Sequence, residues 1–319
     1  MRIAILGGTR FIGRHIADRL VADGHDLLLV HRGEHEPGEL PAAEHAHVDR
    51  HDAAALSAAV KPLGADAVVD VSGMKAVAAD AALAAFGADE RLVAISSGDV
   101  YRAYQALHEG RTSDPVPLAE TAPLREQRYV DGPDYENLEV EERYLAHGGT
   151  VLRLASVYGE HDYQRRFDFV LRRLRAGRTR IPIGAGTFLF SRVYAGDVAA
   201  AVALALSGDH PGQAFNIAER LTASYRLFAD QILAAAGRGA ELVTVPDDLL
   251  PDDLRITRAI GQHLLMDAAK ARDVLGWTES DPPATLLRSV RWHLENPDPD
   301  QADDWSADDR ALASRRTPA

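Results

Sequence analysis

Short apolar runs alternate with longer alanine-rich stretches along the first half of the chain. Uninterrupted apolar runs are typical of strands in a parallel sheet that is buried on both faces, and the stretches between them predict crossover helices. The pattern therefore predicts an α/β fold built on a doubly wound parallel sheet. The predicted strands are Arg2–Leu6, Asp26–His31, Ala67–Val71, Arg91–Ser96 and Thr150–Leu154, and the predicted helices are Phe11–Asp23, Ala53–Val60, Ala76–Phe86 and Tyr135–Ala146.

The pattern changes midway along the chain, where an arginine-rich amphipathic stretch begins. We interpret residues 1–159 as the sheet domain, to which later strands near 188–220 return. Residues 160–187 and 221–295 are interpreted as a smaller substrate cap, and residues 296–319 as an acidic, proline-containing tail in solvent. Further predicted elements are helices at Arg165–Arg180, Ala199–Leu206, Ser224–Ala236, Asp281–Glu295 and Ala307–Ala313, a short piece at Asp267–Leu275, and strands within Gly184–Asp197 and at Ala214–Ala218.

The composition of the chain argues against several classes of function. The chain has 319 residues, a formal net charge of −13 and no cysteine. The absence of cysteine excludes disulfides, thiolate metal ligands and a cysteine nucleophile. The acidic balance argues against nucleic-acid binding, which needs a basic surface. No apolar run reaches the roughly 18–20 residues of a membrane span, and the first apolar stretch is too short for a signal peptide. We therefore expect a cytoplasmic protein that binds neither membranes nor nucleic acid.

A glycine-rich segment directly follows the first predicted strand. It has the sequence GGTRFIG at residues 7–13 and leads into the first predicted helix. Glycines at this turn let backbone amides approach a pyrophosphate closely, and the positive end of the helix favours the same anion. The segment therefore predicts a Rossmann-type dinucleotide site. The residues of the segment expected to contact the cofactor are Gly7, Thr9, Arg10, Phe11, Ile12 and Gly13.

The end of the second predicted strand bears on the choice of cofactor. A site that prefers NAD places Asp or Glu there to bind the ribose hydroxyls, whereas this chain has His31 and Arg32. Together with Arg10, Arg32 suits the 2′-phosphate of NADP(H), which a guanidinium binds through its planar fork. We therefore expect NADP(H) to be preferred over NAD(H), with His31 in the site and Asp52 beside the adenine amine. No metal is expected, because the 13 histidines are scattered and show no carboxylate–histidine spacing.

Further motifs give the chain a resemblance to a known family. They are SGMKAV at 72–77, SSGDVY at 96–101, LRL at 152–154 with VYG at 157–159, and LGW at 275–277. With the glycine segment, they resemble the extended short-chain dehydrogenases/reductases of the nucleotide-sugar epimerase/dehydratase type over roughly residues 1–295. The resemblance implies that the Ser97 hydroxyl hydrogen-bonds the reacting carbonyl. It also implies further cofactor contacts, at Val71, Ser72, Lys75, Leu154 and Val157.

The chain departs from that family at the proton donor. The family uses a Tyr, with a Lys four residues later, to protonate the alkoxide. This chain has no lysine between residues 76 and 269, so the pair is missing. The nearest candidate is Tyr135, with Glu139 where the Lys is expected; a shifted alignment puts Pro133 and Asn137 at the two positions. A glutamate one helical turn away is expected to raise the pKa of the Tyr135 phenol rather than lower it.

Several residues have both a functional and a structural interpretation. Asp99 lies where related dehydratases carry an acid, so it is either a proton donor or a capping or solvated aspartate. Arg192 and Tyr194 either bind the substrate or are structural. Five arginines near the predicted helix either grip a nucleotide diphosphate or form a solvated face, which is favoured. These five are Arg165, Arg166, Arg172, Arg173 and Arg175.

Three functions are compatible with these observations. The first is an NAD(P)H-dependent ketoreductase with Ser97, Tyr135 and Asp99 as catalytic candidates, in which water or a substrate hydroxyl assists proton transfer. The alternatives are a nucleotide-sugar epimerase or dehydratase, and a non-catalytic dinucleotide sensor. The reductase is favoured because an epimerase must begin with an oxidation that relies on an activated Tyr. The expected substrate is a ketone with an adjacent hydroxyl, such as an aromatic polyketide of antibiotic biosynthesis, and the expected assembly is a monomer or homodimer.

Overall fold

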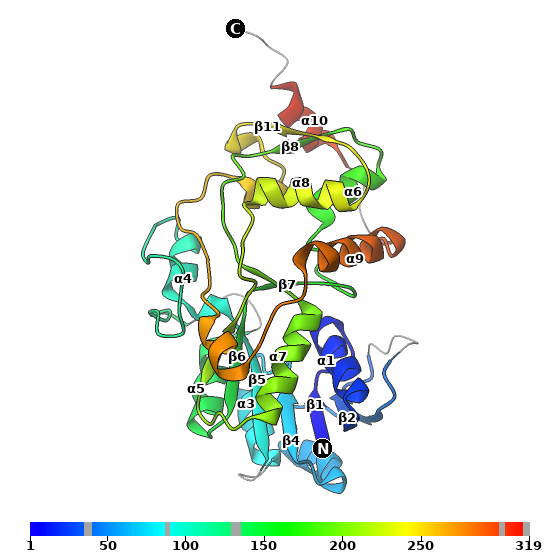
Figure 1. Ribbon diagram of the computed structural model, residues 1–319, viewed down its shortest axis with the longest axis vertical. Helices are drawn as coiled ribbons and strands as arrows, with labels where there is room; N and C mark the ends of the chain where they lie inside the picture. Colours follow the sequence, from blue (N-terminus) through cyan, green and yellow to red (C-terminus); the bar gives the residue numbers. More distant parts are fainter. Residues whose placement is uncertain (35–39, 87–89, 129–134, 300–303, 315–319) are drawn as a thin grey trace.

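A seven-stranded parallel sheet forms the lower half of the molecule in Figure 1, with the strand order β10-β6-β5-β4-β1-β2-β3. The structure is a computed structural model that describes residues 1–34, 40–86, 90–128, 135–299 and 304–314. The doubly wound parallel sheet is thereby confirmed. Its strands are β1 (Arg2–Leu6), β2 (Asp26–His31), β3 (Glu44–His47), β4 (Ala67–Asp70), β5 (Arg91–Ser97), β6 (Thr150–Leu154) and β10 (Ala214–Ile217).

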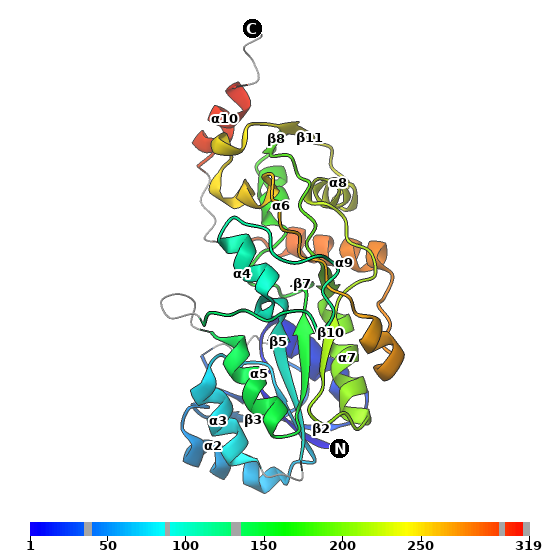
Figure 2. The same cartoon turned by 90° about the vertical axis from the view of Figure 1, so that its left-hand side faces the viewer.

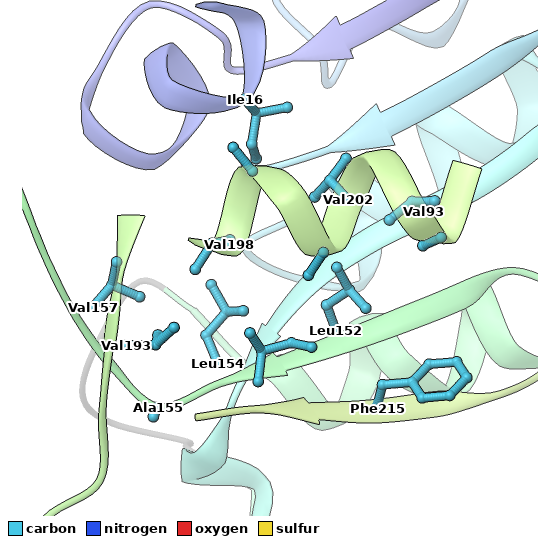
Figure 3. Packing of buried hydrophobic residues seen from close by; sticks show 14 of the residues in the cluster. Ile16, Val93, Leu152, Leu154, Ala155, Val157, Val193, Val198, Val202 and Phe215 are labelled. Carbon is cyan, nitrogen blue, oxygen red and sulfur yellow. The ribbon is translucent and has the colours of Figure 1, made fainter. Parts of the chain in front are cut away.

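Helices cover both faces of the sheet, as Figure 2 shows. On one face, Leu152 and Leu154 of β6 pack with Val198 and Val202 in the core drawn in Figure 3. The inner strands are mostly apolar because each of them contributes side chains to a core on either side. The helices of this first face are α1 (Phe11–Ala22) and α7 (Ala195–Ser207), and those of the second are α2 (Ala53–Val60), α3 (Ala76–Ala85) and α5 (Asn137–Ala146).

A smaller cap stands above the carboxyl edge of the sheet and has its own apolar core (Figure 1). Among the described residues, no helix is both long and apolar enough to cross a membrane. The cap strands are β8 (Arg180–Ile183) and β11 (Glu241–Thr244), and its helices are α6 (Asp168–Arg175), α8 (Tyr225–Ala235) and α9 (Pro282–Glu295). The pair β7 (Ser156–Tyr158) and β9 (Arg192–Tyr194) lies between the two units.

Several predicted boundaries are corrected by the structure. The predicted helix Arg165–Arg180 is reduced to α6, and Arg180 begins a strand instead. The predicted helix Tyr135–Ala146 begins only at Asn137, because the Glu136 side chain caps it by accepting a hydrogen bond from the Leu138 amide at 3.1 Å. Other short elements lie outside the predicted ranges, among them the strands β3, β7 and β11 and the helix α4 (Arg102–His108).

The prediction of a solvated tail is wrong for residues 304–314. The helix α10 (Ser306–Ala313) docks on the cap, where Ala311 and Leu312 join the apolar core. The carboxylate of Asp308 accepts two hydrogen bonds from the Arg173 guanidinium, at 2.7 and 2.8 Å. Arg173 is fully buried and also binds Asp253. The solvated interpretation of the arginines is therefore wrong for Arg173, which is a buried cation between two carboxylates.

We predict that Arg173→Met lowers the free energy of unfolding by about 3–5 kcal/mol, because it leaves the buried Asp308 carboxylate without its cation. Arg180→Met is the matched control. Arg180 binds Glu241 at 3.1 Å, but exposed pairs of this kind contribute at most about 1 kcal/mol. Denaturant unfolding of both variants measures the difference, and equal losses would contradict the importance of burial.

Candidate active site

Two adjoining clefts open at the carboxyl ends of the sheet strands. The first has a volume of about 670 Å³ and lies near the ends of β1, β2 and β4, where ligands bind in open α/β sheets. The second, of about 430 Å³, lies over the ends of β5 and β6. Ile12, Val71 and Met74 line both clefts, which are therefore directly adjacent. The predicted site residues that line the first cleft are Gly7, Thr9, Arg10, Phe11, Ile12, Gly13, His31, Arg32, Val71, Ser72 and Lys75; those that line the second include Ser97, Asp99, Tyr135, Leu154 and Val157.

The glycine segment has no room for a side chain at two positions. A Cβ atom on Gly13 would lie 2.0 Å from the carbonyl oxygen of Gly7, and one on Gly7 would lie 2.8 Å from Oγ of Ser72. Gly7 also has a φ of +95°, which other residues rarely adopt. Arg10, at the cap position of α1, makes no side-chain capping bond. The first-turn amides and the positive end of the helix therefore fit a pyrophosphate.

A buried ion pair forms part of the wall of the first cleft. The Arg50 guanidinium donates to both carboxylate oxygens of Asp70, at 2.5 and 2.7 Å. The hydroxyl of Tyr144 donates to the same carboxylate at 2.6 Å, and Asp70 is fully buried at the end of β4. Arg50 also donates to Oγ of Ser72 at 2.8 Å. The Arg50–Asp70 pair therefore holds the Ser72 hydroxyl in the position against which Gly7 packs.

Two arginines lie in the first cleft beyond the glycine segment. Arg32 follows β2 and forms an exposed ion pair with Glu34 at 2.9 Å. The guanidinium of Arg10 lies 4.1 Å from the ring centre of Tyr163, which reaches the same cleft from the loop after β7. Asp52, in contrast, caps the amino terminus of α2 and is not among the described residues that line this cleft. Its predicted contact with adenine therefore stays a prediction.

The second cleft brings hydroxyl, carboxyl and amide groups together. Ser97 ends β5, and its Oγ accepts a hydrogen bond from the Asp99 amide at 3.3 Å, so its hydroxyl proton is not used in that bond. The Asn137 side chain donates to Oδ1 of Asp99 at 2.8 Å. Tyr135 precedes α5 and lines the same cleft. The shifted alignment places Asn137 at the position of the Lys, and Asn137 contacts Asp99. Pro133, which this alignment places at the position of the Tyr, lies outside the described residues.

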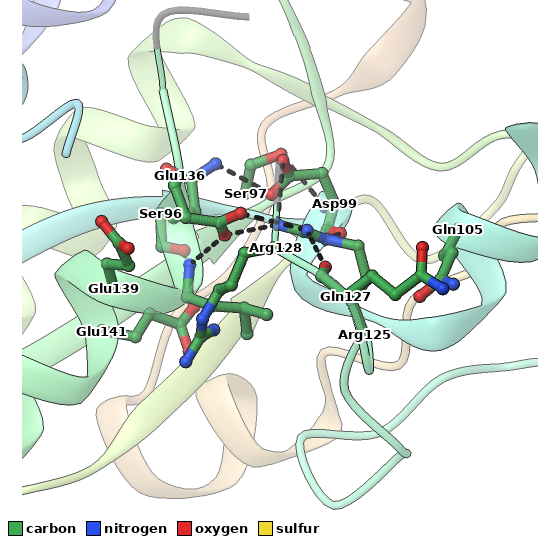
Figure 4. Close-up of polar contacts among 12 residues, drawn as sticks. Ser96, Ser97, Asp99, Gln105, Arg125, Gln127, Arg128, Glu136, Glu139 and Glu141 are labelled. Atoms are coloured by element: carbon green, nitrogen blue, oxygen red, sulfur yellow. Dashed lines mark hydrogen bonds and ion pairs between the residues drawn. The ribbon is translucent and has the colours of Figure 1, made fainter. Parts of the chain in front are cut away.

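Asp99 has an unusual environment for a carboxyl group. It is 2% exposed, and within the described part of the chain its Oδ2 has no hydrogen-bond partner. Burial raises the pKa of Asp99 to about 6, against the opposing effects of the Asn137 bond and the Arg125 charge. Figure 4 shows that Arg125 is shared between two carboxylates: its guanidinium binds Glu136 at 2.7 Å and lies farther, at 4.0 Å, from the Asp99 carboxylate. The interpretation of Asp99 as a solvated aspartate is therefore wrong.

Tyr135 is a weaker acid than an ordinary phenol. Its pKa is raised, first by burial and then by the nearby charge of Asp99. The prediction that Glu139 raises this pKa is wrong. The Glu139 carboxylate instead accepts a hydrogen bond from the Ala76 amide, at 3.3 Å, at the start of α3. The reason is that Tyr135 lies before α5 rather than on it, so the helical spacing between the two residues does not apply.

A buried polar chain supports the strand ends beside the second cleft. The Ser96 hydroxyl donates to Glu141 at 2.5 Å, and Arg153 binds both carboxylate oxygens of Glu141, at 3.0 and 2.7 Å. Arg153 also donates to the hydroxyl of Tyr101 at 3.2 Å, and this hydroxyl donates to Asn216 at 2.6 Å. The chain links α5, β5, β6 and β10, and so holds the segment after β5 in place.

A third cleft, of about 690 Å³, lies in the cap. Arg192 lines it, with its guanidinium 3.7 Å from the ring centre of Phe228 and its Nη2 without a hydrogen-bond partner among the described residues. Tyr194 is instead buried in the cap core, where its hydroxyl donates to Glu160 at 2.9 Å. The arginines of the predicted helix that also line this cleft are Arg165, Arg166 and Arg172.

Three residues that contribute to the clefts were not predicted from the sequence, namely Arg50, Arg125 and Tyr163. Each acts through a partner that the fold brings near, and such pairs have no local spacing to reveal them. One signal was present for the first of them. Asp70 ends an otherwise apolar strand, and a carboxylate in that position requires a buried cation.

Comparison with known proteins identifies the family of this chain. The model of the NAD dependent epimerase/dehydratase family matches residues 3–87 and 74–218, more than half of the chain. A dTDP-6-deoxy-L-talose 4-dehydrogenase (NAD(P)(+)) from Kitasatospora kifunensis is 28% identical, over 91% of this chain and 93% of that protein. A 2′-dehydrokanamycin reductase from Streptomyces kanamyceticus is also 28% identical, over 80% of this chain and 72% of that protein. The chloroplast stem-loop binding protein of 41 kDa b from Arabidopsis thaliana is 27% identical, over 86% and 74% respectively.

A solved structure shows the same architecture. The dTDP-glucose 4,6-dehydratase from Bacillus anthracis, in complex with NAD, superposes with a TM-score of 0.73 and covers 93% of this chain and 97% of its own. At 16% identity this likeness concerns the fold alone. The glycine cradle at the end of β1, the parallel sheet and the family match agree, and the chain belongs to the NAD-dependent epimerase/dehydratase family.

Proposed function

We propose that this protein is an NADPH-dependent ketoreductase in which Asp99, rather than a Tyr–Lys pair, supplies the proton. The observation that carries the proposal is the buried Asp99 carboxyl, with a pKa of about 6, in the cleft that also contains Ser97. A bound nicotinamide cofactor supplies a hydride to the carbonyl carbon of the substrate. The carbonyl oxygen then needs one hydrogen-bond donor and one proton source, and the second cleft offers both.

Ser97 and Asp99 have separate roles in this reaction. The Ser97 hydroxyl donates a hydrogen bond to the carbonyl oxygen, which gains negative charge as the π bond breaks. The protonated Asp99 carboxyl gives its proton to the same oxygen, so that a hydroxyl group forms, and Asp99 takes up a new proton from solvent. Asn137 holds the carboxyl in place through its hydrogen bond to Oδ1.

The names of two relatives describe oxidoreductases, one a dehydrogenase and the other a reductase. We extend this class to the present chain, with a small-molecule ketone as the substrate. A ketone with a neighbouring hydroxyl, such as an aromatic polyketide of an antibiotic pathway, suits a site without an activated Tyr. The net charge of −13 disfavours the nucleic-acid binding that the name of the Arabidopsis relative describes. We further propose a cytoplasmic protein that acts as a monomer or homodimer.

A nucleotide-sugar epimerase or dehydratase is the second candidate, and Arg192 is the observation that favours it. A buried guanidinium on the wall of the third cleft suits a diphosphate. The same wall, however, carries six aspartates against four arginines, which disfavours an anion. Thermal-shift titrations with UDP and dTDP separate the candidates. Stabilisation that is lost in Arg192→Met supports the sugar enzyme, and no shift in the wild type supports the reductase.

The preference for NADPH is tested at Arg32. Its exposed ion pair with Glu34 contributes at most about 1 kcal/mol, whereas a charge-assisted hydrogen bond to phosphate contributes about 1.5–3 kcal/mol. The phosphate therefore competes successfully for Arg32. We predict that Arg32→Ala weakens NADPH binding by roughly tenfold or more and barely changes NADH binding. Glu34→Gln should strengthen NADPH binding, and calorimetric titration measures all three proteins. Equal weakening of the two cofactors by Arg32→Ala would contradict the preference.

The proton donor is tested by steady-state kinetics, with NADPH oxidation followed against a panel of hydroxylated ketones. Asp99→Asn should lower kcat by about 10²–10⁴-fold, because it removes a positioned acid. Ser97→Ala should lower kcat by about 10²–10³-fold, because it removes a hydrogen bond to developing charge. Tyr135→Phe should leave kcat within about tenfold, as should its matched control Tyr104→Phe from the same cleft. A loss of about a thousandfold in Tyr135→Phe alone would instead identify Tyr135 as the acid.

The raised pKa of Asp99 also affects stability. The carboxyl of an unfolded chain ionises near pH 4, whereas the pKa of Asp99 in the folded protein is about 6. Between about pH 4 and pH 6 the folded state therefore binds more protons than the unfolded state, so this contribution to stability falls as pH rises. We predict that the unfolding free energy of the wild type, taken relative to Asp99→Asn, decreases across this window and is level above it. Denaturant unfolding at several pH values measures the difference, and a difference that is constant or increases with pH would contradict the assigned pKa.

A further inference from the structure

Three histidines meet at the edge of the sheet, away from the reacting groups. His31 ends β2, and His45 and His47 lie two residues apart on β3, the edge strand. His47 is paired with His31 in the parallel register, and residues two apart on a strand share a face. The three imidazoles therefore project from one face of the sheet. Strand pairing, rather than sequence spacing, brings His31 beside the other two histidines.

The three rings are close enough to share one ion. The ring centre of His31 lies 5.1 Å from that of His45 and 4.9 Å from that of His47. Nε2 of His31 lies 2.8 Å from Nδ1 of His45, and one potential ligand atom from each residue lies within 4.8 Å of the others. Ligand nitrogens at about 2.0–2.1 Å from a tetrahedral zinc ion are about 3.3 Å apart. Small ring rotations therefore suffice to bring the three nitrogens to this spacing.

The ligand type and exposure favour a late transition metal. His45 and His47 are exposed and His31 is half-buried, so an ion can enter from solvent. Imidazole suits Zn²⁺, Ni²⁺ and Cu²⁺, whereas Mg²⁺ and Ca²⁺ prefer oxygen ligands. Three histidine ligands also leave a fourth coordination position for water.

A bound metal ion would change two hydrogen bonds of His31. The Gly33 amide donates to Nδ1 of His31 at 3.1 Å, so the proton of the neutral ring is on Nε2 and is donated to Nδ1 of His45. A metal ion bound to Nε2 replaces that proton, the ring is then protonated on Nδ1, and the bond from Gly33 is lost. Gly33 has a φ of +78°, and a Cβ atom on it would lie 3.4 Å from the His47 ring. Metal binding therefore shifts the turn that follows β2.

We propose that His31, His45 and His47 form a binding site for a divalent late transition metal ion, Zn²⁺ or Ni²⁺. The site adjoins the first cleft, which His31, Arg32 and Gly33 also line. The ion takes no part in hydride or proton transfer, because the reacting groups lie in the second cleft. The proposal therefore does not rest on the proposed reductase activity, although occupancy of the site changes the turn that carries Arg32.

Calorimetric titration of the untagged chain with ZnCl₂ and NiCl₂ tests the proposal, with MgCl₂ as the comparison. We expect one equivalent of Zn²⁺ or Ni²⁺ to bind, with no binding of Mg²⁺. Co²⁺ gives a second readout that does not depend on activity, because cobalt in a tetrahedral site absorbs visible light much more strongly than the hydrated ion.

His45→Ala and His47→Ala should each weaken Zn²⁺ binding by about tenfold or more, since loss of even an outer-shell partner weakens metal sites by about 10–100-fold. Both residues are exposed, so the fold should be preserved, and the double variant should lose the site. His51→Ala is the matched control, because His51 is exposed, lies four residues beyond His47 and hydrogen-bonds Asp49 at 2.8 Å. The proposal is overturned if the wild type binds no Zn²⁺, if the His45 and His47 variants bind it as the wild type does, or if only His51→Ala weakens it.

Discussion

The ion pair between Arg50 and Asp70 is the interaction on which the cofactor half of the molecule depends. A carboxylate at the end of a buried strand is tolerated only with a cation beside it, and removing one partner of such a pair costs about 3–5 kcal/mol. Arg50 provides that cation and also donates to Ser72 and to the carbonyl oxygen of Ala78. One guanidinium thereby joins the end of β4, the helix α3 and the hydroxyl against which Gly7 packs.

Where the resemblance implies a lysine, this chain has a helix rich in carboxylates, and each of these carboxylates has a structural partner. Glu136 caps α5 and binds Arg125, Glu139 binds the start of α3, and Glu141 joins Ser96 to Arg153. None of these glutamates is placed to activate a phenol. In the proposed reaction, the proton therefore comes from the other side of the second cleft, where the segment after β5 carries the buried carboxyl of Asp99.

Features that depend on neighbours in sequence were predictable. The apolar runs predict the sheet because a strand buried on both faces must be apolar throughout, and the glycine segment identifies the turn because only glycine fits its close contacts. Features that depend on distant partners were not predictable. β3 is short and largely polar, so nothing in EHAH distinguishes an edge strand from a loop. The prediction that Glu139 acts on Tyr135 was wrong for the same reason, since the partner of Glu139 is the amide of Ala76 on another helix.

The docked helix α10 has a consequence for the order in which the chain folds during synthesis. Arg173 leaves the ribosome 135 residues before Asp308, the carboxylate that completes its surroundings. Chains fold from the amino terminus as they emerge, so the sheet domain can form while Arg173 in the cap still lacks one of its two carboxylate partners. The cap should therefore be the last part of the nascent protein to acquire its native packing, and the part most exposed to proteases if translation stops early.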